Sequence, residues 1–288
     1  MIVVSRWVAN AFGLVIGISL ACSGCASRTL NQGVESDLSW SPNSELLTSG
    51  DCSHEGQCAR VEHVFPVFQG NGQSSTLLNR WVLERLSGYR SGYATAESRK
   101  AAARAFLGDF EAATAQLPDE VGPDWFDAHR IEVIHDTDRL VSLAHDRSWY
   151  TGGAHPNASR LLVTFDLEDA EELTLDTVLR DGVETRLADL QTRALRRVHG
   201  LPADADLADA GFSTDADGRV PLSRNFAVVA DGWLFRWDAY EIAPYAMGPS
   251  EVTLGWREVA NLVRRGSPAA PPEPPKVAEE DENTPDER

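Results

Sequence analysis

The sequence predicts an α+β fold, with a mainly antiparallel sheet packed against helices in a single two-part domain. Three observations predict it. Segments with apolar residues every three or four positions alternate with segments whose apolar period is two. The segments of period two are separated by short turn sequences, which favours antiparallel pairing. Roughly 265 residues remain behind an N-terminal export signal, enough to bury a core unaided.

The N-terminus has the pattern of an export signal. Arg6 is its only charge, and an apolar run of about 15 residues follows, shorter than the roughly 20 that a membrane-spanning helix needs. The run ends in small residues before Cys22 and Cys25, which resembles bacterial lipoprotein signals. We expect residues 1–21 to be removed and Cys22 to be lipidated, with Cys25 as the alternative acceptor. An ordinary secreted protein is the competing interpretation.

Lipidation predicts a protein held on the periplasmic or extracellular side of a membrane. Neither Ser23 nor Ala26, the residues after the two cysteines, is the aspartate that retains lipoproteins at the inner membrane of some Gram-negative bacteria. The outer membrane is therefore the default expectation.

Residues 22–57 are expected to be a flexible tether that carries a small disulfide loop. Their composition is rich in Ser, Asn and Thr without a clear apolar period. Cys52 and Cys58 are separated by five residues, and disulfides persist outside the cytoplasm. Metal binding by this pair together with His54 is the minor alternative, since the spacing is not CxxC.

The first part of the predicted domain covers residues 58–147. Loose alternation predicts a strand over 60–68, and Ser74 or Ser75 can cap a helix that ends near Gly88. A second helical pattern covers 97–117 and stops at Pro118. The period then falls to two, which predicts strands over 126–135 and 140–150.

The second part covers residues 148–265. Apolar patterns predict a strand over 161–167 and a helix from Asp176 or Thr177 to Val198. Three more strands, over 226–229, 232–240 and 251–254, and a short helix over 256–265 complete it. The segment 266–288 is rich in proline and acidic residues, has almost nothing apolar to bury, and is predicted to be disordered.

The formal net charge of −18 excludes some partners and favours others. Nucleic acid is a poor partner because little here would neutralise its phosphates. Cationic proteins are plausible partners, although an acidic surface can also serve solubility alone.

Two constrained loops carry the candidate binding residues. Tyr150 and His155 flank Gly152 and Gly153, and Pro156 stiffens the chain directly after the histidine. Pro244 and Tyr245 follow an aromatic strand in a loop bounded by proline and glycine. Large side chains on a constrained loop suit protein recognition, because ordering them costs little entropy. Alternatively, His155 caps a neighbouring backbone group in a shaped hairpin.

No motif predicts catalysis, a cofactor or a metal. The histidines form no HxH, HxxxH or HExxH pattern, and there is no GxSxG, SxxK or phosphate-binding glycine loop. The segment 215–218 resembles part of a calcium loop, but the twelfth position would be Arg224 in place of glutamate.

Several motifs together resemble the DUF3298 domain family. The motif YTGGAHPN at 150–157, followed by FDL at 165–167 and LTLD at 173–176, resembles its first half. Residues from Phe226 onward, with WLF at 233–235 and YEIAPY at 240–245, resemble its second half. The region from Val61 to about His145 resembles the companion DUF4163 segment.

This resemblance implies an α+β binding module of the cell envelope. The family occurs in the extracellular part of RsiV, an anti-sigma factor that senses lysozyme by binding it, and beside the catalytic domain of a peptidoglycan deacetylase. The sequence shows no transmembrane helix, sigma-binding segment or deacetylase domain, so only partner recognition is carried over. We expect Tyr150, His155, Pro244 and Tyr245 to contact a lysozyme-like protein or peptidoglycan. An envelope hydrolase that uses His155 and a purely structural protein are the alternatives.

Overall fold

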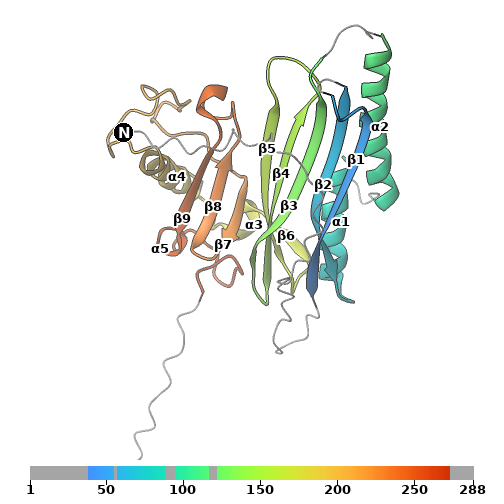
Figure 1. Cartoon of the computed structure of the whole chain (residues 1–288). Helices are drawn as coiled ribbons and strands as arrows, with labels where there is room; N and C mark the ends of the chain where they lie inside the picture. The colour runs from blue at the N-terminus through green and yellow to red at the C-terminus, as the bar shows by residue number, and fades with distance from the viewer. Residues whose placement is uncertain (1–37, 55–56, 89–94, 117–121, 273–288) are drawn as a thin grey trace, which may run out of the picture.

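The computed structural model describes residues 38–272 except 55–56, 89–94 and 117–121. The strands of this part form a six-stranded sheet and a three-stranded sheet (Figure 1). All neighbouring strands except one pair are antiparallel, so the predicted α+β class with a mainly antiparallel sheet is confirmed. Among the described residues, no helix has the length and apolar character needed to cross a membrane.

In the large sheet, the strands lie side by side in the order in which they occur along the chain. Its strands are β1 (Ser39–Gly50), β2 (Cys58–Gln69), β3 (Trp125–Asp136), β4 (Leu140–Tyr150), β5 (Asn157–Asp166) and β6 (Glu171–Leu173). The β2–β3 pair is parallel. The reason is the connection between these strands, which holds the helices α1 (Gln73–Ser87) and α2 (Ala96–Gln116) and is long enough for a crossover.

The small sheet belongs to the second part of the chain. It contains β7 (Phe226–Val229), β8 (Gly232–Trp237) and β9 (Ser250–Gly255), and α4 (Glu184–Val198) packs against β9. The remaining helical segments are α3 (Leu175–Val178), η1 (Tyr245–Met247) and α5 (Trp256–Val259). Trp233 and Phe235 are fully buried in the core that this sheet shares with α4.

The molecule is layered (Figure 1). Helices α1 and α2 cover one face of the large sheet, and the small sheet and α4 lie on its other side. Strand β4 is buried on both faces: Leu143 packs in the cluster that holds α1 residues, whereas Ala144 packs against Ala227 of β7. Polar bonds also join the sheets, since Ser142 Oγ donates to the carbonyl of Val228 at 2.6 Å. The two predicted parts therefore share contacts through β4, β5 and β7.

The predicted tether from 22 to 57 is wrong over its second half. Residues 39–50 form β1, which pairs with the whole length of β2. The sequence hides this strand because the face turned to α2 is polar apart from Leu47, while the apolar Trp40 and Leu46 lie on the exposed face. Arg99 of α2 also forms an ion pair with Glu45 of β1.

The predicted disordered tail begins later than expected. Ala269 is fully buried, and its carbonyl accepts a hydrogen bond of 2.9 Å from Trp233 Nε1. The segment 266–272 therefore packs against the core that the small sheet shares with α4. The predicted signal peptide, Cys22, Cys25 and residues 273–288 lie outside the described residues.

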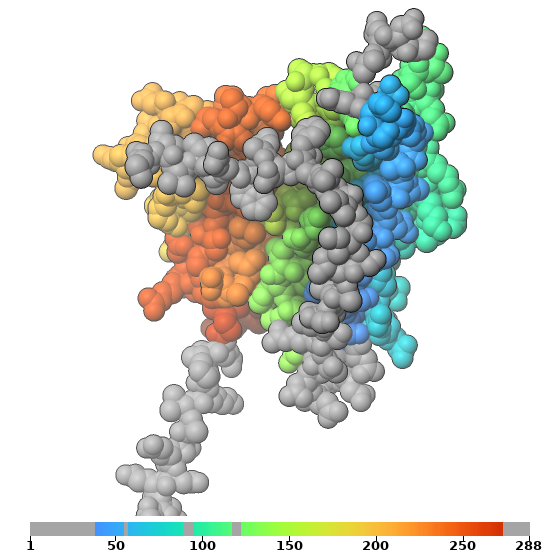
Figure 2. Space-filling view, in the orientation of Figure 1, coloured from blue at the N-terminus to red at the C-terminus, as the bar shows by residue number. Residues whose placement is uncertain are grey.

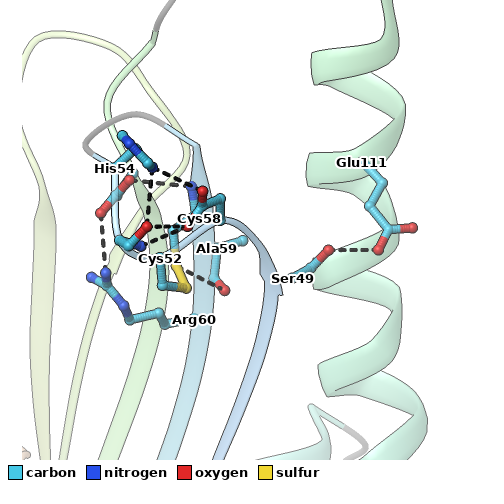
Figure 3. The surroundings of a disulfide bond; sticks show 10 residues. Ser49, Cys52, His54, Cys58, Ala59, Arg60 and Glu111 are labelled. Atoms are coloured by element: carbon cyan, nitrogen blue, oxygen red, sulfur yellow. Dashed lines mark hydrogen bonds and ion pairs between the residues drawn. A yellow bond between two sulfur atoms is a disulfide. The ribbon is translucent and has the colours of Figure 1, made fainter.

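The predicted disulfide is confirmed. Cys52 and Cys58 are bonded at the turn between β1 and β2 (Figure 3). Beside them, Asp51 accepts hydrogen bonds from Ser53 and contacts His54. These bonds hold the pKa of Asp51 at about 2, with the Ser53 hydroxyl as the largest cause.

Three predicted elements differ from the expectation: one is divided and two end earlier. The helix predicted to Val198 is divided into α3 and α4, because Gly182 takes a left-handed conformation between them. The final helix stops at Val259, after which the chain runs back along α3 and Arg264 N donates to the carbonyl of Val178. Strand β8 stops at Trp237, since a turn follows in which Tyr240 has a φ of 73°.

Candidate functional site

His155 and Tyr245 form a stacked pair between the two constrained loops. Their ring centroids are 4.0 Å apart and their planes differ by 19°. The Tyr245 hydroxyl donates to the carbonyl of Pro156 at 2.9 Å, and the same carbonyl lies 2.9 Å from His155 Nδ1. The hydrogen bonds therefore fix the η1 loop to the turn between β4 and β5.

Two further apolar side chains extend this pair into a surface. Tyr240 lies 5.5 Å from Tyr245 between ring centroids and is 65% exposed. Met247 belongs to the same 3-10 turn as Tyr245, and both are 38% exposed. We call His155, Tyr240, Tyr245 and Met247 the aromatic patch. In Figure 2 the orange surface of this loop meets the yellow-green surface of the β4–β5 turn.

The structure brings three of the four predicted contact residues together. Pro244 is the residue before η1, and its carbonyl accepts a hydrogen bond from Met247 N. Tyr150 lies apart from the stacked pair: its hydroxyl donates to the carbonyl of Gly153, and its ring packs 6.2 Å from that of Phe126. Tyr150 therefore shapes the turn that holds His155.

Charged groups anchor the loop that carries Tyr240. Asp238 accepts hydrogen bonds from the backbone N of Arg160 at 3.1 Å and from Arg236 Nε at 2.8 Å. Arg236 also pairs with Glu251 at 3.0 Å. Since Arg160 belongs to β5 of the large sheet and Arg236 to β8 of the small sheet, the aromatic patch is supported by both sheets.

A second group of chemistry-bearing residues is buried between the large sheet and the helices. We call His63, His129 and His145 with Asp127 the histidine cluster. His129 Nδ1 lies 3.0 Å from His145 Nε2, and His129 Nε2 lies 3.1 Å from Asp127 Oδ1.

Burial changes the acid–base properties of the histidine cluster. It lowers the pKa of His145 to about 3 and that of His63 to about 4, and the neighbouring His129 adds to both effects. Burial alone would raise the pKa of Asp127, but hydrogen bonds from His129 and Arg147 outweigh it and bring the pKa to about 2. The cluster thus combines the charged carboxylate of Asp127 with two histidines, His63 and His145, that resist protonation.

The sequence does not reveal the histidine cluster. Its three histidines belong to β2, β3 and β4, and only the register of these strands places His63 opposite His129. In the part of the chain that the structure describes, no three His, Cys, Asp or Glu side chains are arranged to hold a metal ion. The facing nitrogens of His129 and His145 bond to one another instead.

Comparison with known proteins identifies two regions of the chain. Residues 176–257 match the model of a family described as a protein of unknown function, DUF3298, and residues 52–158 match the model described as deacetylase PdaC. Residues 150–157, assigned above to a DUF3298-like part, fall within the second match. No curated protein matches the sequence.

Two solved structures share the fold. A DUF3298 family member from Bacteroides fragilis has 19% identity and a TM-score of 0.66, with 79% of this chain and 94% of that chain covered. A DUF3298 family protein from Pseudomonas aeruginosa has 20% identity and a TM-score of 0.56, with 78% and 94% covered. Residues 176–257 are therefore similar to the DUF3298 family, and the two solved structures that share the fold are described as members of that family.

Proposed function

We propose that this chain is a lipid-anchored binding module of the cell envelope, whose contact surface for a protein partner is the aromatic patch. The stacked His155–Tyr245 pair carries the proposal, because the Tyr245 hydroxyl locks two loops from different sheets while leaving the ring partly exposed. Rigid aromatic side chains lose little conformational entropy on binding, and tyrosine is enriched among residues that dominate binding energy.

The surroundings of His155 favour binding over hydrolysis. A hydrolytic histidine needs a carboxylate or another group that orients its ring and a nucleophile within hydrogen-bond reach. Among the described residues, the contacts of His155 are the carbonyl of Pro156 and the ring of Tyr245. The ring is therefore held by a backbone oxygen and a stacking partner, an arrangement that supports recognition.

A cationic, lysozyme-like protein is the partner that we propose first. The net charge of −18 favours encounter with a basic partner. The resemblance to RsiV supports the same choice, and the match to a model named for a deacetylase supports a place in the envelope. Peptidoglycan is the second candidate ligand.

The anchor of this module is proposed from the sequence alone. Lipidation at Cys22, or at Cys25, would hold the folded part outside the cytoplasm, with the outer membrane as the default. Because β1 begins at Ser39, the proposed tether is shorter than the sequence suggested, about 13 to 16 residues after the lipidated cysteine.

Calorimetric titration with lysozyme tests the proposal. The protein is prepared from residue 26 onward, which keeps β1 and removes both candidate lipid sites. We expect binding in the micromolar range or tighter, and a loss of tenfold or more for Tyr245→Ala, about 1.4 kcal/mol. Leu46→Ala, which removes an exposed apolar side chain from β1, is the matched control and should bind as the parent does.

The outcomes separate the candidate partners. Absence of heat with lysozyme at micromolar concentrations would exclude a lysozyme-like partner. Co-sedimentation with purified peptidoglycan then tests the second ligand with the same two variants. Equal binding by Tyr245→Ala and Leu46→Ala would exclude the aromatic patch as the contact surface.

A further inference from the structure

A hollow of about 480 Å³ lies between α1 and the turn that joins β5 to β6. One wall is formed by side chains of α1, which are Leu77, Arg80, Trp81, Glu84 and Arg85. The opposite wall is formed by Ala170 and the first residues of β6, Glu171 and Glu172. We call this hollow the α1 groove. Its volume falls in the range of small-ligand sites.

The floor of the α1 groove is aromatic. The rings of Trp81 and Phe165 meet edge to face with centroids 5.9 Å apart, and both side chains are almost fully buried. The guanidinium carbon of Arg85 lies 5.3 Å from the Trp81 ring centroid, which holds the charged group at the groove. This floor suits an apolar side chain that lies below charged groups.

Two arginines at the α1 groove lack an acidic partner. Among the residues that the structure describes, neither the exposed Arg80 nor the half-buried Arg85 forms an ion pair, although Arg99, Arg160 and Arg236 do. Arg85 Nε is buried without a hydrogen-bond partner, which is costly for a charged donor. A carboxylate is the group that a guanidinium binds best, through two parallel hydrogen bonds.

The opposite wall is acidic, and within the described part of the chain Glu171 and Glu172 form no ion pair. Burial raises the pKa of Glu172, and Glu84 adds to this effect while Arg85 opposes it. Next to these glutamates, Ala170 has a φ of 50°, a left-handed conformation that is unfavourable for a residue with a side chain. Such strain is often kept at ligand sites. An ammonium group would neutralise this wall.

We propose that the α1 groove binds a short zwitterionic peptide with an apolar side chain. The peptide carboxylate pairs with the two arginines, its ammonium group with the two β6 glutamates, and its apolar side chain lies over the aromatic floor. This site is separate from the aromatic patch and does not depend on the proposed protein partner.

Calorimetric titration of the full chain with leucyl-leucine tests this site. Two blocked peptides serve as matched ligands: N-acetyl-leucyl-leucine lacks the ammonium group and leucyl-leucinamide lacks the carboxylate. We expect the free dipeptide to bind in the millimolar range or tighter, and each blocked form to bind at least about tenfold more weakly. No binding of the free dipeptide, or equal binding of all three peptides, would overturn the proposal.

Variants assign the binding to the α1 groove. Arg85→Gln and Arg80→Gln should each weaken the dipeptide at least about fivefold, whereas Arg257→Gln, an exposed arginine of α5, should leave its affinity unchanged. Far-UV circular dichroism checks folding. If Arg85→Gln does not fold, Arg80→Gln decides, because Arg80 is exposed at the rim. Unchanged affinity in a folded arginine variant, or an equal loss in Arg257→Gln, would refute the assignment.

Discussion

Mild acid is expected to destabilise this protein through the histidine cluster. His63 and His145 are almost fully buried, and their pKa values of about 4 and about 3 lie well below the 6.5 of a free histidine. The folded state therefore excludes protons that the unfolded chain binds. Above pH 6.5 neither state binds these protons, and the free energy of unfolding is unaffected. Below pH 6.5 the unfolded chain gains protons, so the free energy of unfolding falls as the pH approaches the folded-state pKa values.

The neighbourhood of the two histidines explains why the folded state resists protonation. His129 of β3 and the cations Arg99 of α2 and Arg85 of α1 disfavour a further positive charge. Arg147 of β4 acts in the same direction on His145, while Asp127 of β3 and Glu45 of β1 oppose it less strongly at the sites they face.

The magnitude follows from the pKa differences. Between pH 7.5 and pH 5.0 the unfolded form of each histidine gains most of a proton, while the folded form gains almost none. Each histidine then contributes about 2 kcal/mol to the loss, and the two together about 4 kcal/mol. Asp127 adds nothing in this interval, because its contribution is lost only below its ordinary pKa of 3.8, towards about 2.

Urea denaturation at pH 7.5 and pH 5.0, followed by tryptophan fluorescence, measures this loss. His145→Asn removes one of the two groups and should reduce the loss to about half that of the parent protein. His155→Asn, outside the cluster, should keep the parent dependence. Equal unfolding free energies of the parent at the two pH values, or an undiminished loss in His145→Asn, would show that burial does not set the pH dependence.

Three further predictions concern the disulfide, the C-terminal segment and the proposed lipid site. Replacing Cys52 and Cys58 with serine should lower the unfolding free energy by about 2 kcal/mol, because the disulfide closes a short loop; an unchanged urea midpoint would contradict this. Ending the chain at residue 265 should cost about 1 to 3 kcal/mol, because Trp233 Nε1 loses its buried acceptor, whereas ending it at 272 should cost nothing measurable; equal stability of the two truncated chains would contradict this. Cys22→Ser should abolish labelling by radioactive palmitate in cells and Cys25→Ser should not, and the reverse result would move the proposed lipid site to Cys25.

The parts of the fold that the sequence predicted correctly are those with a local sequence pattern. The period of apolar residues located α1, α2 and the core strands within a few residues, because a helix or strand buries one face at a fixed spacing. The spacing of Cys52 and Cys58 predicted their disulfide. The glycines and prolines around His155 and Tyr245 marked both loops of the aromatic patch, since these residues restrict the backbone locally.

Only the tertiary structure decided which segments meet. The face of β1 turned to α2 is mostly polar, so pairing with β2 and not an apolar pattern marks this strand. The two sheets pack together through contacts between β5 and β7, which are far apart in sequence. Strand register, which has no local signature, assembled the histidine cluster. Packing of the η1 loop on the β4–β5 turn placed Tyr245 beside His155 and left Tyr150 aside. The sequence by itself determined the periodic elements and their order, whereas non-local packing determined which side chains meet at a site.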